Sequence, residues 1–328
     1  PSCLVPNQKM SNFLGSVHLN WLIFTLLVQF KFLHNLFNND SMNTGGRNVK
    51  IKEAIEKGMI ELKVDNVETP KLKARLLMQF VLKKDRQYVI VNDMNNLTTA
   101  QEKKYFEYIK KLRRGIPLEY ITHQREFMKL NFFVDENVLI PRADTEILVE
   151  EVIKIAKKMR AKKILDLCTG SGIIAVSLAK YIDNCEITAT DISKGAIAIA
   201  KKNAIINKVE DKITFIESDL FSNIPNSKYD IIVSNPPYIK KEIINKLDKQ
   251  VQKEPRIALD GGYDGLDFYR KIIFQAYEYL KYNGYLCFEI GYDQKEDVSN
   301  LLKNNGNYSI TYSLKDLYDN DRVIVAKI

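Results

Sequence analysis

The chain has 328 residues, of which 45% are hydrophobic, so it is long enough for about two domains and is not a disordered or fibrous protein. Its net charge of +8 comes from the front of the chain, because Lys and Arg outnumber Asp and Glu there, whereas the two signs balance from Glu136 onward. A basic front half favours an acidic partner such as nucleic acid, although a lysine-rich surface without such a partner explains the excess equally well. No Cys-x-x-Cys pair occurs, which argues against a disulfide framework and a zinc site and fits a reducing cytoplasm; the four cysteines are Cys3, Cys168, Cys185 and Cys287.

Residues 1–41 are interpreted as an N-terminal extension outside the fold. The apolar stretch Trp21–Val28 is unbroken for eight residues only, which is too short for a membrane span. It also lacks the charged start and the small-residue cleavage pattern of a signal peptide. We therefore expect the working protein to begin near Met42, to stay off the membrane and to be cytoplasmic.

Residues 42–115 are predicted to form a small helical domain that recognises the substrate. Apolar residues recur at helical spacing from Ile51 to Leu62 and from Leu72 to Val81, and a polar cap near Thr99 precedes a third helical pattern. These patterns indicate a bundle of about four helices. Residues 116–138 are predicted to be a β-hairpin linker, because apolar residues alternate in 118–121 and again in 128–134.

From residue 139 to residue 328 strand and helix patterns alternate, as in a mostly parallel α/β sheet. The last two strand patterns have no helical pattern between them, so they are expected to pair in antiparallel fashion. Seven strands are predicted in all, at 163–167, 186–190, 213–217, 229–234, 285–290, 310–313 and 323–328. The main helices are predicted at 144–159, 173–181, 194–207 and 266–280.

A glycine-containing loop, Leu165–Gly172, joins the first of these strands to a helix. Its glycines allow the backbone to turn tightly and to lie against a nucleotide-type cofactor. Asp191 ends the next strand about twenty residues later, where a carboxylate can accept hydrogen bonds from ribose hydroxyls or can simply cap a helix. On this loop alone, an NAD-dependent dehydrogenase remains an alternative.

Two further acidic residues favour S-adenosylmethionine as the cofactor. Asp166 precedes the glycines and Asp219 follows the third strand, and carboxylates repel a pyrophosphate but suit a sulfonium and an adenine amino group. Each Asp alone could be a surface or capping residue. The predicted cofactor-binding residues are Asp166, Cys168, Thr169, Gly170, Ser171, Gly172, Asp191, Asp219, Leu220 and Asn235.

The segment Ser234–Tyr238, with the sequence Ser-Asn-Pro-Pro-Tyr, follows an apolar strand pattern. Asn235 offers a side-chain acceptor, Pro236 a carbonyl outside sheet pairing, Pro237 stiffness and Tyr238 a flat ring. Such a group can hold a planar NH2 toward an electrophile, although the same residues also form ordinary turns.

Other candidates belong to the segments that precede the first strand of the α/β domain. Phe127 of the hairpin is a candidate for the substrate pocket, and a place in the core is an equally good interpretation. Thr145 and Glu146, which follow Arg142, are candidates for cofactor support or for a helix cap. No metal site is expected.

Six blocks of this sequence resemble the bacterial peptide-chain release factor glutamine methyltransferases, the HemK or PrmC family. They occur from about Val49 to the C-terminus in the family's order, at 113–121, 125–127, 139–146, 166–172, 234–239 and 254–266. The resemblance implies a Rossmann-like, class I S-adenosylmethionine-dependent methyltransferase domain. It also implies methylation of the side-chain nitrogen of the glutamine in the Gly-Gly-Gln motif of release factors, by a monomer that needs no nucleic acid. One position departs from the family, which usually has Gly where this chain has Cys168, and this departure concerns cofactor affinity.

In the expected mechanism, the Asn235 side-chain oxygen and the Pro236 carbonyl accept the two protons of the glutamine amide, and Tyr238 packs on it. The nearest alternative is a nucleic-acid adenine-N6 methyltransferase, because the same motif serves any planar NH2 group. A binding-only module would be expected to carry a disrupted acceptor motif, and a dehydrogenase leaves Asn235–Tyr238 without a role.

Overall fold

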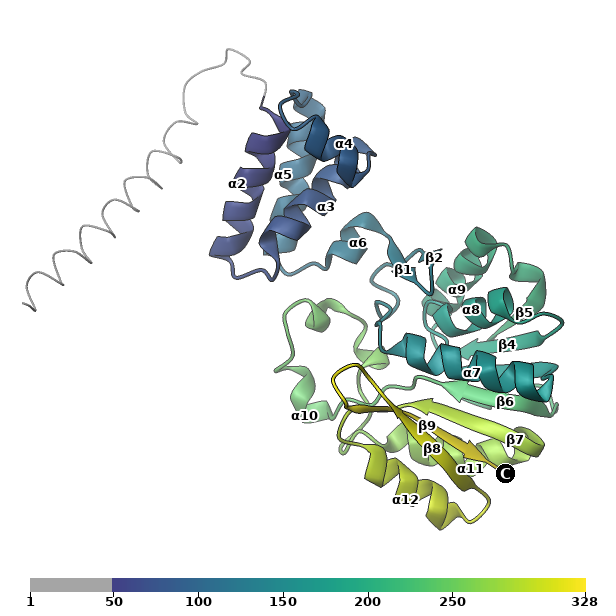
Figure 1. The fold of residues 1–328 in the computed structure, drawn as a ribbon. Coiled ribbons are helices and arrows are strands. Elements are labelled where there is room, and N and C mark those ends of the chain that lie inside the picture. Colours follow the sequence, from purple (N-terminus) through teal and green to yellow (C-terminus); the bar gives the residue numbers. More distant parts are fainter. Residues whose placement is uncertain (1–48) are drawn as a thin grey trace, which may run out of the picture.

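The computed structural model describes residues 49–328, so the expectation for residues 1–41 lies outside the described part (Figure 1). Four helices open the described chain, as predicted, and their bounds are α2 (Ile51–Val64), α3 (Pro70–Leu82), α4 (Arg86–Val91) and α5 (Thr99–Arg113). Helix α5 begins with a capping box, in which the Thr98 hydroxyl and the Gln101 side chain bind each other's backbone N–H groups. A core of their own, which includes Leu62, Leu77 and Ile109, holds these helices together.

The linker differs from the prediction in its first half. Residues Leu118–Thr122 form the short helix α6, and the hairpin consists only of β1 (Arg125–Phe127) and β2 (Leu130–Phe132). A helical turn lets the adjacent residues Tyr120 and Ile121 face two cores, because neighbouring side chains on a helix point about 100° apart. Ile121 joins the core of the helical domain, and Tyr120 packs in a small cluster with residues of the sheet domain such as Ile199.

The prediction of a seven-stranded, mostly parallel sheet is confirmed. The strand order is β5-β4-β3-β6-β7-β9-β8, and only the pairs that involve β9 are antiparallel. The strands are β3 (Lys163–Leu167), β4 (Glu186–Asp191), β5 (Ile213–Glu217), β6 (Tyr229–Ser234), β7 (Leu280–Glu289), β8 (Ser309–Lys315) and β9 (Asp321–Lys327).

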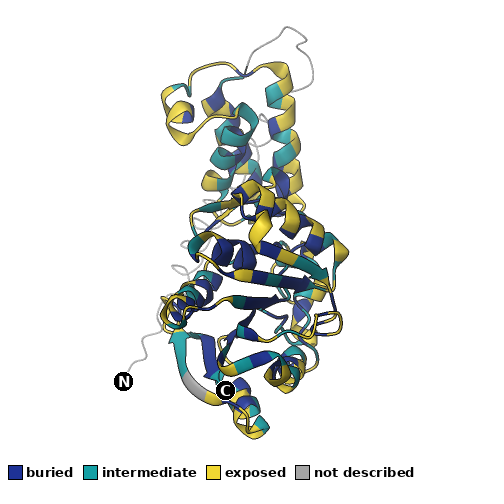
Figure 2. Cartoon of the chain, turned by 90° about the vertical axis from the view of Figure 1, so that its right-hand side faces the viewer, coloured by how far each residue is buried: buried dark blue, intermediate teal, exposed yellow. Residues whose placement is uncertain are grey.

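Helices cover both faces of the sheet, which therefore has a core on each side (Figures 1 and 2). One core contains residues of α7 (Thr145–Met159), α8 (Ile173–Tyr181) and α9 (Lys194–Asn207). The other contains residues of α11 (Asp267–Tyr279) and α12 (Lys295–Asn305), while the short α10 (Lys241–Ile244) lies in the segment after β6. Because side chains alternate along a strand, Ile164 of β3 faces the first core and Leu165 the second.

The strand order reverses direction between β3 and β6. From β3 the chain continues outward to β4 and β5, whereas β6 returns to the other side of β3 and leads to β7. In open parallel sheets ligands bind where such a reversal opens a crevice beyond the carboxyl ends of the strands. The glycine loop follows β3 and the Asn-Pro-Pro-Tyr segment follows β6, so both predicted motifs meet at this crevice. Within residues 49–328, no helix is both long and apolar enough to cross a membrane.

Candidate active site

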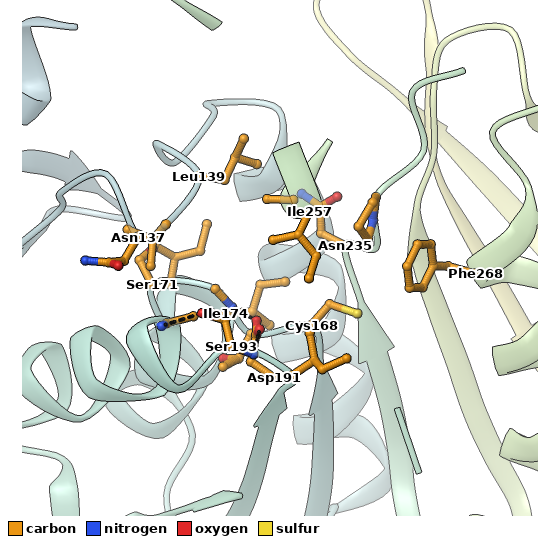
Figure 3. Close-up of a pocket in the computed structure, with 18 of the residues that line it drawn as sticks. Asn137, Leu139, Cys168, Ser171, Ile174, Asp191, Ser193, Asn235, Ile257 and Phe268 are labelled. Carbon is orange, nitrogen blue, oxygen red and sulfur yellow. Dashed lines mark hydrogen bonds between the residues drawn. The ribbon is translucent and has the colours of Figure 1, made fainter. Parts of the chain in front are cut away.

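A cavity of about 260 Å³ lies beyond the carboxyl ends of β3, β4 and β6 (Figure 3). The residues predicted to bind the cofactor form one wall of the cavity, and those predicted to bind the methyl acceptor form another. The two sets come from segments that are far apart in the sequence. Nine predicted site residues line the cavity, namely Cys168, Thr169, Gly170, Ser171, Asp191, Asp219, Leu220, Asn235 and Pro237.

The cofactor wall is built on the loop after β3. Gly170 has φ +55° and a Cβ added there would meet no atom within 4 Å, so its backbone borders open space. Asp191 fixes this loop, because its Oδ2 accepts a 2.9 Å hydrogen bond from the Gly170 N–H and its Oδ1 a 2.9 Å bond from the Ser193 N–H. Each carboxylate oxygen has a second lone pair for a ligand hydroxyl. Burial raises the pKa of Asp191, and its backbone hydrogen bonds oppose that rise.

Asp166 does not line the cavity, which corrects its predicted contact with the cofactor. It is 0% exposed, because strand alternation turns it toward the start of α8. Its Oδ2 accepts hydrogen bonds from the Thr169 hydroxyl at 2.6 Å and the Ala175 N–H at 3.2 Å, and its Oδ1 has no partner among the described residues. Burial raises its pKa to about 7 despite these two bonds. Asp166 therefore holds the glycine loop in place through its hydrogen bonds to Thr169 and Ala175.

Gly172 is also absent from the cavity wall, and its role is packing. Its φ is +81°, and an added Cβ would lie 3.0 Å from the Cβ of Ala200. Glycine at this position thus allows the loop to turn and α8 to approach α9 closely. Its expected contact with the cofactor is corrected to support of the loop.

Cys168 lies on the cavity wall with φ +59°, a left-handed conformation that favours glycine. This backbone explains why the related proteins usually have Gly here. Burial, followed by the negative charge of Asp191, raises the pKa of the Cys168 thiol, so the neutral thiol is the form that borders the cavity. The side chain therefore adds bulk to the cofactor wall without adding charge.

The acceptor wall begins directly after β6. Asn235 lines the cavity, and its Nδ2 donates a 3.2 Å hydrogen bond to the Thr145 Oγ1. Its Oδ1 accepts no hydrogen bond from the described residues, and neither does the carbonyl of the buried Pro236. Both acceptors thus lack a partner, but only Asn235 lines the cavity, because Pro236 is buried beside it and is absent from the wall. Pro237 completes the wall.

The 254–266 block, which is distant from Tyr238 in the sequence, packs closely against the end of the acceptor wall. A Cβ on Gly261 would lie 2.7 Å from the Cα of Tyr238, and a Cβ on Gly265 would lie 2.5 Å from the Tyr238 carbonyl oxygen. The same oxygen accepts a 3.0 Å hydrogen bond from Gln294 Nε2, and the Ile239 N–H donates to the Leu259 carbonyl at 3.0 Å. The glycines of the 254–266 block thus permit a close backbone approach that larger residues would prevent.

Three candidates have places other than the predicted ones. Tyr238 does not line the cavity; its ring packs against the core that contains α11, and its hydroxyl lies 3.5 Å from the Glu289 Oε1. Phe127 is 2% exposed and belongs to the core, where it packs edge-on against Phe132. Glu146 is also absent from the wall, because its Oε1 accepts a 2.7 Å hydrogen bond from the Met128 N–H of the hairpin. Tyr238 and Phe127 therefore lie outside the wall of this cavity, and for Phe127 the structure agrees with the core interpretation that the sequence also allowed.

Arg142 and Thr145 do line the cavity. Arg142 donates a 2.6 Å hydrogen bond to the buried Glu254, whose other oxygen accepts a 2.9 Å bond from the Ile140 N–H. Burial raises the pKa of Glu254, and Arg142 opposes the rise. This pair ties the 139–146 block to the 254–266 block, so two of the blocks recognised in the sequence meet at the cavity.

Several wall residues were not predicted from the sequence. Ser193 is two residues beyond Asp191 and caps α9, a signal that was available. Ile257 lies inside the 254–266 block, and Phe268 and Lys271 follow it on α11, so extension of that block would have found them. Leu139 opens the 139–146 block, whereas no sequence pattern distinguishes Asn137. The unpredicted wall residues include Asn137, Leu139, Ser193, Ile257, Phe268 and Lys271.

The wall suits a ligand that carries both signs of charge and an apolar base. Asp191 and Asp219 supply negative charge, Arg142 and Lys271 supply positive charge, and side chains such as Leu220 supply apolar surface. S-adenosylmethionine has a sulfonium, an amino acid end, ribose hydroxyls and an adenine, so these residues fit it. The open space at Gly170 is the kind of backbone surface that such a cofactor covers.

Comparison with known proteins gives matches on both domains. Residues 143–262 match the methyltransferase small domain, and residues 53–122 match the PrmC N-terminal domain. The release factor glutamine methyltransferase of Clostridium acetobutylicum is 43% identical over 281 residues, which cover 85% of this chain and 98% of that protein. Its namesake in Clostridium botulinum is 40% identical over 280 residues, covering 84% and 99%.

A solved structure is also similar in sequence. The protein-(glutamine-N5) methyltransferase (release factor-specific) of Alicyclobacillus acidocaldarius is 30% identical, and the match covers 60% of this chain and 98% of that one. The TM-score of this match is 0.37.

Proposed function

Because this chain belongs to the release factor glutamine methyltransferase family, we propose that it methylates the glutamine side-chain nitrogen in the Gly-Gly-Gln motif of peptide-chain release factors. The methyl donor is S-adenosylmethionine. The observation that carries the proposal is the free Oδ1 acceptor of Asn235, in the same cavity as the wall that the cofactor loop forms.

The cofactor wall would hold S-adenosylmethionine through Asp191 at the ribose, with Asp219 and Leu220 beside the adenine. When bound, the cofactor supplies a methyl group on a positively charged sulfur. The loop Cys168–Ser171 would border it, and Asp166 would keep that loop in shape through Thr169 and Ala175.

The acceptor wall would orient the substrate amide. An amide nitrogen is a poor nucleophile, because its lone pair is delocalised into the carbonyl, so the protein must hold the NH2 group in one direction. The Asn235 Oδ1 and the Pro236 carbonyl would accept its two N–H bonds. Because the nitrogen becomes more positive during transfer, each acceptor binds the transition state more strongly than the ground state and contributes roughly 2 to 4 kcal/mol.

The helical domain would recognise the release factor. Its sequence matches the N-terminal domain of the same family, and the basic excess of the chain lies in and ahead of this region. We infer that the enzyme acts as a monomer in the cytoplasm and without a nucleic acid cofactor. An adenine-N6 methyltransferase activity would leave the match of residues 53–122 without an explanation.

The test is transfer of label from S-adenosylmethionine to a purified release factor. A release factor whose Gly-Gly-Gln glutamine is replaced serves as the matched control. We expect label on the first protein and none on the second. Label on both would show that the methylated atom is elsewhere, and label on neither would reject the proposal. A DNA substrate in a third reaction tests the nucleic-acid alternative directly.

A further inference from the structure

Glu289 is a buried acidic residue to which the mechanism above gives no role. It is the last residue of β7 and is 1% exposed. Because side chains alternate along the strand, Glu289 shares with Cys287 the sheet face that α7 covers, while Phe288 faces the opposite core. An acidic side chain at the carboxyl end of a buried strand thus lies beneath the start of α7 and beside the acceptor wall.

The surroundings of Glu289 connect it to Asn235. Burial raises the pKa of Glu289 to about 7, and the polar groups of Thr145 and Asn235 beside the carboxyl group oppose that rise. In the present geometry Oε2 accepts no well-formed hydrogen bond from the described residues, and Oε1 lies 3.5 Å from the Tyr238 hydroxyl. An unpartnered oxygen of a buried carboxylate is unfavourable, so nearby donors are drawn to it.

The other charged and polar groups around Glu289 do not compete for this role. Asp144 acts on it with negative charge and Arg322 with positive charge. The Tyr269 hydroxyl donates to the backbone carbonyl of Glu289 at 2.8 Å, which fixes the strand end but leaves the carboxylate free. The Tyr238 hydroxyl donates to Oε1, so Thr145 and Asn235 remain as the donors that lie near the unpartnered Oε2.

Orientation of the Asn235 amide decides whether the acceptor wall works. With Nδ2 directed to the Thr145 Oγ1, as the 3.2 Å hydrogen bond shows, Oδ1 is free for the substrate. In the flipped orientation Nδ2 would meet the N–H groups of the substrate amide, and two donors would face each other. A threonine hydroxyl alone does not select between the two orientations, since it both donates and accepts. A carboxylate behind it does, because the hydroxyl must then donate to the carboxylate and accept from Asn235.

We propose that Glu289 is a positioning residue which, through the Thr145 hydroxyl, keeps the Asn235 amide nitrogen turned inward and its oxygen turned toward the methyl acceptor. This proposal rests on the function proposed above, because it explains how the Asn235 oxygen stays directed toward the substrate amide. It assigns Glu289 no contact with the substrate and no proton transfer.

The first test compares isosteric variants in the full-length chain. Glu289→Gln and Thr145→Val should each lower kcat at least tenfold, while the Kd for S-adenosylmethionine, measured by calorimetry, stays within about threefold. Thr145→Ser keeps the hydroxyl and should restore kcat to within about threefold of the unaltered protein. Glu151→Gln makes the same chemical change at a buried acid on α7 that binds Lys154 and Tyr312, and it should leave kcat unchanged.

The pH dependence adds a readout that mere structural support would not change. Protonation of Glu289 removes the reason for the Thr145 hydroxyl to donate inward. The kcat of the unaltered protein should therefore rise between pH 6 and pH 8, and this rise should be missing in Glu289→Gln. A Glu289→Gln protein with more than half of the normal kcat and the normal pH profile would overturn the proposal. If that variant does not fold, equal kcat values for Thr145→Val and Thr145→Ser would overturn it.

A measurement without methyl acceptor separates this proposal from the proposed function. With 15N-labelled asparagine and bound S-adenosylmethionine, the Nδ2 protons of Asn235 should exchange slowly with water and should exchange faster in Glu289→Gln. Equal exchange rates in the two proteins would reject the positioning role, even if release factor is methylated. Slow exchange in a protein that methylates no release factor would uphold the positioning role and reject the proposed function.

Discussion

The two walls of the cavity are each built over one fully buried carboxyl group, but they are assembled over different distances along the chain. On the cofactor wall, Asp166 bonds to Thr169 and Ala175, only 3 and 9 residues away. On the acceptor wall, Asn235 bonds to Thr145, 90 residues away, and Glu289 approaches both. The cofactor wall is therefore a property of one strand, loop and helix, whereas the acceptor wall exists only when several remote segments are packed together.

The largest expected difference between the walls follows from Asn235→Ala. Loss of one transition-state acceptor should lower kcat about 10²- to 10³-fold, with the Kd for S-adenosylmethionine nearly unchanged. Single-turnover kinetics and calorimetry measure the two effects. Retention of more than about a tenth of the normal rate would contradict the role of Asn235.

Asp191→Ala is the matched change on the other wall. It removes a carboxylate from the cofactor side and the hydrogen bond to Gly170, so the Kd for S-adenosylmethionine should increase at least tenfold, while kcat at saturating cofactor falls much less. If both variants changed the same parameter, the division of the cavity into two walls would be wrong.

The buried acids of the two walls should make stability depend on pH in the same direction. Burial raises the pKa values of Asp166 and Glu289 to about 7, above those of the unfolded chain. Their stabilising contribution is therefore full below about pH 4 and is lost as the pH rises through 7. Relative to the unaltered protein, Asp166→Asn and Glu289→Gln should each gain on the order of 2 kcal/mol of unfolding free energy between pH 5 and pH 8.

Urea unfolding of the three proteins at several pH values provides the measurement. A variant whose stability stays parallel to that of the unaltered protein over this range would show that the replaced acid does not titrate there.

Gly261→Ala should damage the acceptor wall alone. The added methyl group would lie 2.7 Å from the Tyr238 Cα and 2.9 Å from the Pro237 carbonyl oxygen, so the backbone must move, at a cost of about 1 to 3 kcal/mol of unfolding free energy. We expect lower kcat with normal cofactor affinity. At Gly306 an added methyl group meets no atom within 4 Å but φ is +79°, so Gly306→Ala strains the backbone at the end of α12 and controls for a loss of stability alone. A similar kcat for both variants would argue against the close contact of Gly261 with Tyr238.

Cys168→Gly should have the smallest effect, and on the cofactor wall. Glycine relieves the left-handed conformation of Cys168 but gains freedom in the unfolded chain, so stability should rise by no more than about 1 kcal/mol. The Kd for S-adenosylmethionine should stay equal or fall. Cys168→Ala removes the thiol but keeps a Cβ, so it should not be stabilised. A weaker cofactor affinity in Cys168→Gly would show that the thiol contributes to binding.

Comparison of the walls also explains which sequence predictions succeeded. The loop 166–172 and Asp191 could be placed from local patterns, because a strand followed by glycines and a helix defines its own geometry. Local patterns did not predict which loop residues face the cavity. Strand alternation turns the Asp166 side chain away from it, toward α8, and the packing of α8 on α9 places Gly172 against Ala200. Tyr238 was expected at the site because of its flat ring, yet it packs against a core, and Phe127, for which the sequence left pocket and core open, lies in the other core.

The sequence by itself determined the alternation of strands and helices, the helical front domain, the cofactor loop and the acceptor motif, because each depends on side-chain periodicity or on the backbone freedom of a few residues. Only the tertiary structure decided what supports that motif. Glu289 carries no local signal of a function, since an acidic residue at the end of a strand is common. The block that contains Gly261 is recognisable in the sequence, but its close approach to Tyr238 is not. Both residues matter because the reversal of strand order between β3 and β6, together with the packing of α7, brings Thr145, Asn235 and Glu289 to the same place.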